Sequence, residues 1–155
     1  MYIKEQKFLI LGASKSGFAV ANYLVKNGAF VKVYEELTSK KAISAVEKLK
    51  EIGLENLTKE QWAKQTFSKD VEEIKNADVV IMLFYGLYSD SGTSWECGYA
   101  FATNKPVVVV HLHEGKSNCM INCGSYSNLK GLQELENYDF DKMPIYNYYN
   151  IDIKG

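Results

Sequence analysis

Two stretches of uninterrupted apolar residues constrain the fold of this chain most strongly. The segment Ala77–Phe84 reads ADVVIMLF, and Pro106–His111 reads PVVVVH. Neither shows the alternation of apolar and polar residues that marks a strand with one face in water, so we expect both to be strands covered on both faces. Shorter apolar strands are expected at Lys7–Leu11 and Ala29–Tyr34.

Segments with helical patterns alternate with these strands. Capping residues, glycine stops and apolar spacing predict helices at residues 18–26, 40–52, 59–75, 94–104 and 129–137, followed by an extended segment. Apolar strands that alternate with helices are typical of a parallel sheet. We therefore expect an α/β fold, with residues 1–155 forming a single domain. Its five-stranded parallel sheet would carry helices on both faces, as in flavodoxin-like and Rossmann-like proteins.

Charge and hydropathy exclude some classes of partner. The formal net charge is -1, so no basic surface favours nucleic acid. No apolar run approaches the roughly 20 residues of a membrane helix, and the N-terminal run is too short for a signal peptide. We expect a cytoplasmic protein with no membrane or nucleic-acid partner.

The cysteines raise the question of a metal site. Cys119 and Cys123, with His111 and His113, could be imagined as zinc ligands, but they lack paired C-x-x-C spacing. The two histidines are expected to lie on one face of a strand. We expect these cysteines and Cys97 to be free thiols in a reducing compartment, and we expect no metal.

The loop GASKSG follows the first expected strand and precedes a helix, the position of a phosphate-binding turn. Gly12, Ser14, Ser16 and Gly17 are its candidate substrate-binding residues, and Glu35-Glu36 could hold a ribose. The turn resembles the opening of Mur ligases, although its G-x-x-x-x-G spacing differs from G-x-G-x-x-G. A tight turn that needs glycine only for its backbone explains the pattern equally well.

A second loop carries two carboxylates. Asp90 and Glu96 flank Gly92, Thr93 and Ser94, which places Asp90 on the loop and Glu96 in the first turn of a helix. The helix dipole favours an ionised Glu there, which suits a nucleophile, while a second acid can move a proton. Spacing alone leaves a structural alternative open, in which Asp90 forms the turn and Glu96 is a favourable helix charge.

Three sequence blocks resemble the nucleoside 2-deoxyribosyltransferase family. They are WAKQTFSKDVEEIKNADVVIM from Trp62, DSGTSWECGYA from Asp90 and NKPVVVV from Asn104. The family carries an aspartate before an A-D strand start, then D-x-G-x-x-x-E-[IL]-G-[YF], then a K-P-V strand, and the blocks occur here in that order. Met120–Asn122 and Asp139–Asp141 are similar to its later segments, so the resemblance covers the chain after residue 57.

The resemblance implies an enzyme that exchanges the base of a 2′-deoxynucleoside by a two-step, retaining displacement. It implies that Glu96 is the nucleophile, and that Asp70 and Asp90 bind the base and donate a proton. Gly92-Thr93 would contact substrate, and Asn122 would be lent to a neighbouring subunit's sugar site. The implied partners are a nucleoside or nucleotide, a free nucleobase and further copies of the chain, with no cofactor.

The first part of the chain departs from the family pattern. Leu9–Gly12 offers no hydroxyl where the family has a Tyr that orients the nucleophile, so Tyr85, Tyr88 or Tyr99 would have to substitute. The chain also continues to Gly155, past the Tyr on which family chains tend to end. Two alternatives remain: a deoxynucleoside 5′-monophosphate N-glycosidase whose GASKSG loop holds the phosphate, and a non-catalytic nucleotide-binding module that uses the same loop.

Overall fold

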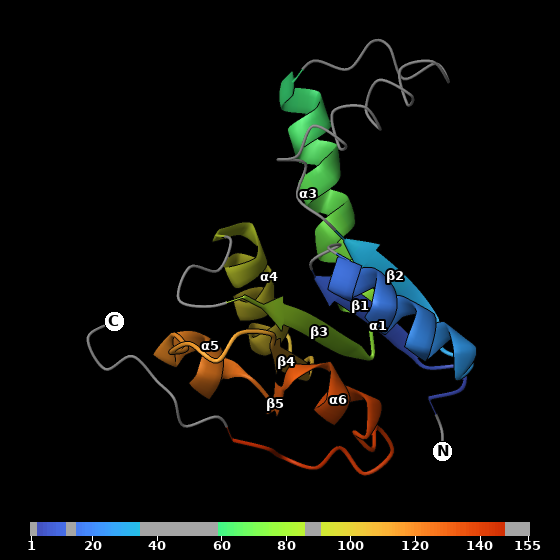
Figure 1. Cartoon of the computed structure of the whole chain (residues 1–155). Coiled ribbons are helices and arrows are strands. Elements are labelled where there is room, and N and C mark those ends of the chain that lie inside the picture. The colour runs from blue at the N-terminus through green and yellow to red at the C-terminus, as the bar shows by residue number, and fades with distance from the viewer. Residues whose placement is uncertain (1–2, 12–14, 35–58, 86–90, 148–155) are drawn as a thin grey trace.

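The computed structural model describes residues 3–11, 15–34, 59–85 and 91–147 (Figure 1). Strands and helices alternate along the described chain, as the apolar pattern predicts. The strands are β1 (Lys7–Leu11), β2 (Phe30–Tyr34), β3 (Val79–Phe84), β4 (Val107–His111) and β5 (Ser127–Lys130). The helices are α1 (Lys15–Lys26), α3 (Lys59–Asn76), α4 (Ser91–Ala102), α5 (Cys119–Gly124) and α6 (Gly131–Glu136). The helix expected at 40–52 lies outside the described residues.

The strands form one five-stranded sheet in the order β2-β1-β3-β4-β5. Every neighbouring pair is parallel, with Leu9 opposite Val80 and Val109 opposite Asn128. The expectation of a parallel five-stranded α/β fold is therefore confirmed. β3 and β4 are buried along their whole length, which explains their uninterrupted apolar sequences.

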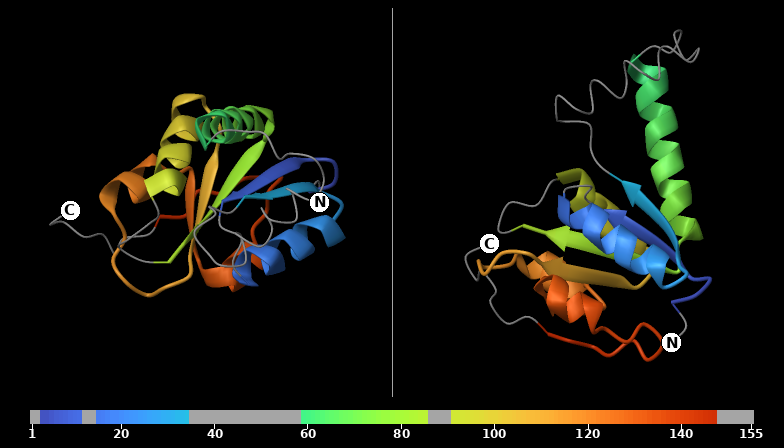
Figure 2. Two further views of the ribbon diagram at one scale, coloured as in Figure 1. Left: turned by 90° about the horizontal axis from the view of Figure 1, so that it is seen from above. Right: turned by 45° about the vertical axis from the view of Figure 1, so that its right-hand side comes forward.

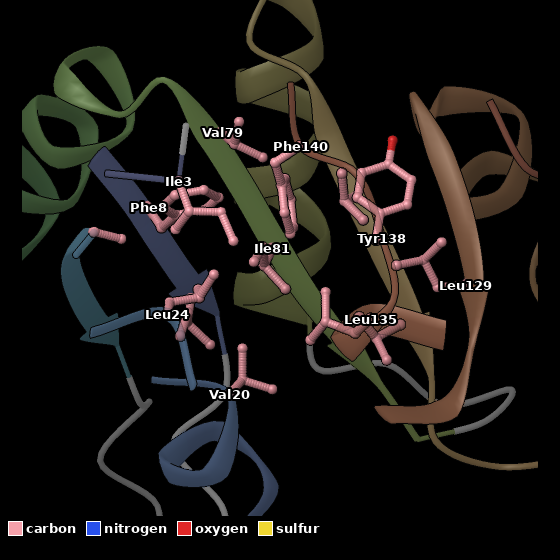
Figure 3. Close-up of a cluster of buried hydrophobic side chains, with 14 of the residues drawn as sticks. Ile3, Phe8, Val20, Leu24, Val79, Ile81, Leu129, Leu135, Tyr138 and Phe140 are labelled. Carbon is pink, nitrogen blue, oxygen red and sulfur yellow. The ribbon is translucent and has the colours of Figure 1, made fainter. Parts of the chain in front are cut away.

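Helices cover both faces of the sheet, and each face has its own core (Figure 2). On one face α1 and α6 pack over Phe8, Ile10 and Ile81, together with the aromatic rings of Tyr138 and Phe140 (Figure 3). On the other face, residues of α3, α4 and α5 join apolar side chains of β1, β3 and β4. The alternation of side chains along each strand supplies both cores at once.

The structure differs from the expected pattern most after residue 115. The helix expected at 129–137 is instead strand β5 followed directly by α6, whose first residue, Gly131, has φ 68°. Three of the four residues of β5 are polar, which hides this strand in the sequence. The short helix α5 lies where a loop was expected, and β4 ends at His111, so His113 lies beyond the strand.

Residues 144–147 run beside β5. The backbone N–H of Asn128 donates to the carbonyl of Tyr146, and the N–H of Tyr146 donates to the Ser127 hydroxyl. The Tyr138 hydroxyl donates to the carbonyl of Pro144 at 2.8 Å. These bonds satisfy polar groups of the edge strand that would otherwise face solvent. Among the described residues, no helix is long and apolar enough to cross a membrane.

Candidate functional site

Most candidate residues belong to the segments that follow the carboxyl ends of β1, β3 and β4, whereas Asp70 lies on α3, which precedes β3. Because β1, β3 and β4 are neighbours and parallel, the segments that leave their carboxyl ends share one edge. β2 pairs with one side of β1, and the next strand in the described chain, β3, pairs with the other side. The strand order therefore reverses at β1, and ligands of open parallel α/β sheets bind at such a point. Gly12, Ser14 and Asp90 lie on these connections but outside the described residues, so their placement stays a prediction.

Glu96 is buried, with 6% of its surface exposed. It lies on α4, the helix that follows β3. The first-turn position expected for it is wrong: α4 begins at Ser91, so Glu96 is in the second turn, and Gly92 and Thr93 are helical. The helix dipole acts mainly within the first turn, so it contributes less to this carboxylate than expected. Burial, with the negative charge of Glu96, raises the pKa of Cys97 to about 12.

Asp70 lies on α3 and is half-buried. Phe67, one turn earlier on the same helix, contacts Trp95 of α4 with ring centroids 5.2 Å apart. Trp95 in turn stacks on Tyr99, at 5.4 Å and an interplanar angle of 6°. Residues three apart share one face of a helix, so this contact holds the part of α3 that carries Asp70 against the part of α4 that carries Glu96.

Ser16 and Gly17 lie in the first turn of α1, and Gly92 and Thr93 lie in the first turn of α4. Gly17 is buried, and the other three are half-buried. The two helix starts follow the adjacent strands β1 and β3 but pack on opposite faces of the sheet. The first-turn backbone N–H groups of the two helices therefore lie on opposite faces of the sheet near the strand ends.

Asn122 is buried on α5, with 8% of its surface exposed, and belongs to a polar network that the sequence did not predict. The side-chain amide of Asn128 on β5 donates to the backbone carbonyl of Asn122 at 3.1 Å. Its Oδ1 lies 3.0 Å from Nε2 of His111, the last residue of β4. The sequence signals this network only through His111 at the end of an otherwise apolar β4 and through the polar residues of β5.

The histidines and cysteines do not assemble into a metal site in the described part of the chain. His111 bonds to Asn128, whereas the exposed His113 accepts a hydrogen bond from the backbone N–H of Gly115. The three thiols are free, with Cys97 buried and Cys119 and Cys123 exposed. No group of three or more metal-ligating side chains occurs among the described residues.

Comparison with known proteins adds family evidence. The family model described as nucleoside 2-deoxyribosyltransferase matches residues 18–131, a segment that contains the three candidate acids and Asn122. A nucleoside deoxyribosyltransferase of Lactobacillus johnsonii is 33% identical over 98 residues, which cover 62% of this chain and 65% of the relative. A nucleoside deoxyribosyltransferase of Lactobacillus leichmannii is 29% identical over 90 residues, 57% of each chain. The chain therefore covers less than two thirds of either relative.

A solved structure shares the fold. It is described as a 2-deoxyribosyltransferase from the psychrotolerant bacterium Bacillus psychrosaccharolyticus, and it superposes with a TM-score of 0.64. The match covers 92% of this chain and 99% of that chain at 24% sequence identity. At this identity, the likeness supports the arrangement of the sheet and helices only.

Proposed function

The chain belongs to the nucleoside 2-deoxyribosyltransferase family, and we propose that it exchanges the nucleobase of a 2′-deoxynucleoside for a free base. The proposal rests on the burial and position of Glu96. It is a buried carboxylate beyond the end of β3, within the segment that the family model matches. Burying a carboxylate costs free energy, so a buried carboxylate suggests a function. One such function is that of a nucleophile shielded from water.

Two displacements account for the exchange. In the first, a carboxylate oxygen of Glu96 attacks C1′; the new C–O bond forms as the C–N bond breaks, and the leaving base takes a proton from an acid. In the second, a nitrogen of the incoming base attacks C1′, the ester bond breaks, and the Glu96 carboxylate is regenerated while a proton returns to the acid. Two inversions give net retention at C1′. Atoms and charges balance without a metal or an organic cofactor.

Asp70 and Asp90 are the acids that we assign to base binding and proton transfer. For Asp70, support comes from its half-buried position and from the Phe67–Trp95 contact, which holds its helix against α4. The glycine- and serine-rich starts of α1 and α4 are assigned to substrate binding. These binding residues are Gly12, Ser14, Ser16, Gly17, Gly92 and Thr93.

Asn122 is assigned to the sugar, in a site completed by a neighbouring copy of the chain. Its place on α5, beyond the carboxyl end of β4, puts it at the same edge of the sheet as α4. We therefore expect an oligomer. A purified protein that is monomeric by light scattering and still exchanges bases would contradict the shared site.

The test is an incubation of the protein with a 2′-deoxynucleoside and a different free base, followed by chromatography. A new deoxynucleoside of the same anomeric configuration supports the proposal. Free deoxyribose without a new nucleoside would mean that the protein is a glycosidase and not a transferase. A parallel incubation with a deoxynucleoside 5′-monophosphate identifies that activity. If no substrate is turned over but nucleotides raise the melting temperature, the protein is a non-catalytic nucleotide-binding module.

Replacing Asp70 by Asn is expected to lower kcat for base exchange by about 100-fold or more, because an amide cannot donate and recover the proton of the departing base. The matched control is Glu72→Gln, which makes the same chemical change at an exposed position on the same helix. Initial rates with saturating deoxynucleoside and base measure the effect. Equal rates for the two variants would remove Asp70 from the mechanism.

A further inference from the structure

The helix that carries Asn122 is too short to be stable by itself. α5 has 6 residues, and isolated helices shorter than about 12 residues are marginal in water. Side chains instead satisfy its terminal backbone groups. Asn118 Oδ1 accepts from the N–H of Met120 at 2.8 Å, and the Ser125 hydroxyl donates to the carbonyl of Ile121. Asn128, which lies on β5, supplies the bond from the sheet to the carbonyl of Asn122.

The hydrogen bonds of Asn128 determine the tautomer of His111. The amide nitrogen of Asn128 donates to a carbonyl, so its Oδ1 faces His111 as an acceptor. A neutral imidazole carries one N–H, and here Nε2 must carry it. Burial lowers the pKa of His111. This shift favours the neutral ring, with Nε2 as its donor.

His111 also contacts the neighbouring strand. Its ring and that of Phe84, the last residue of β3, form a T-shaped pair with centroids 5.4 Å apart and an interplanar angle of 71°. Both His111 and Asn128 are 4% exposed. The buried His111 ring therefore contacts two parts of the fold. Phe84 ends β3, which leads to the helix of Glu96, and Asn128 bonds to the helix that carries Asn122.

We propose that His111 and Asn128 are positioning residues, which fix α5 so that Asn122 is held in register with the sugar during base exchange. This role rests on the function proposed above. It requires both groups of the network. An apolar side chain at position 128 would leave the Asn122 carbonyl without its tie to the sheet, and an apolar ring at position 111 would leave Asn128 Oδ1 without the donor that orients the amide. Misplacing a substrate-positioning group by about 1 Å can cost about 100-fold in rate.

Two substitutions at His111 separate positioning from packing. His111→Gln keeps an amide donor near the place of Nε2, whereas His111→Phe keeps a ring against Phe84 and loses the donor. We expect His111→Phe to lower kcat by about 10- to 100-fold with a smaller change in KM for the deoxynucleoside, and His111→Gln to retain most of kcat. If only packing mattered, Phe would be tolerated better than Gln, and that order would overturn the proposal.

A second measurement does not depend on activity. The chain has two histidines, so ¹⁵N spectra of the imidazoles, with the exposed His113→Gln as assignment and activity control, are simple to read. Wild type should show His111 as the neutral Nε2–H tautomer. Hydrogen exchange at the Asn122 amide, which donates to the carbonyl of Asn118 at 3.0 Å, should accelerate in His111→Phe and not in His111→Gln.

The two measurements separate the possible failures. If wild type does not exchange bases but amide exchange follows the expected order, the proposed function fails while the positioning of α5 stands. If wild type is active and His111→Phe changes neither kcat nor amide exchange, the positioning proposal is overturned and the function stands. The opposite tautomer at His111 would also overturn it.

Discussion

Glu96→Gln is expected to lower kcat for base exchange on the order of 10⁴-fold or more, the scale seen when an enzyme loses its nucleophile. The amide has almost the same shape as the carboxylate but is a far weaker nucleophile, so the covalent deoxyribosyl intermediate does not form. Single-turnover mixing with deoxynucleoside measures the first displacement directly, as release of the free base. Base released from wild type and not from the variant locates the defect in that step.

The stability of the same variant separates a catalytic Glu96 from a structural one. The side chain is 6% exposed, and an uncharged amide is cheaper to bury than an ionised carboxylate. We therefore expect the melting temperature of Glu96→Gln to equal or exceed that of wild type, as is common when a functional charge is removed. A marked fall in melting temperature with unchanged turnover would make Glu96 a structural residue. The control is again Glu72→Gln, which should change neither quantity.

Chemical rescue gives a third readout of the nucleophile. In the proposed mechanism, Glu96→Ala opens space at the face of the sugar that the carboxylate attacks, and azide can enter this space. Attack by azide on C1′ is a single displacement, so the deoxyribosyl azide formed would have the inverted configuration. A product with retained configuration would place the nucleophile elsewhere in the chain.

The sheet could be predicted because its strands carry a strong local signal. β3 and β4 are apolar at nearly every position, and only a strand covered on both faces requires that pattern. β5 carries no such signal, since Asn128 and Lys130 interrupt it. Its assignment depends on pairing with β4 and on the segment at 144–147, which are contacts between residues far apart in the sequence.

The motif selects the candidate residues, but it does not fix where they lie in their elements. The role of Glu96 stays a prediction, and its expected place in the first turn is wrong, because α4 begins at Ser91, three residues before the expected start. The sequence indicates His111 only as a possible metal ligand. Its bond to Asn128 follows from the register in which Val109 faces Asn128, and a single sequence does not contain that register.

Phe140→Ala is expected to destabilise the fold by about 3–5 kcal/mol, the usual cost of deleting a buried Phe side chain. Phe140 is 2% exposed and meets Phe8 edge to face, with ring centroids 5.0 Å apart, in the core on the α1 and α6 side (Figure 3). It also meets Tyr138 at 4.8 Å. In a chain of this size, the loss corresponds to a fall in melting temperature on the order of 10 °C.

The matched control is Phe101→Ala, the same deletion at a side chain that is 63% exposed on α4. It should change stability by no more than about 0.5 kcal/mol. Urea unfolding followed by fluorescence measures both variants. The segment after α6 lies beside β5, where the Tyr146 carbonyl bonds to Asn128. If Phe140→Ala cost no more than the control, this segment would not be part of the cooperative core, and β5 could not hold Asn128 rigidly enough to position α5.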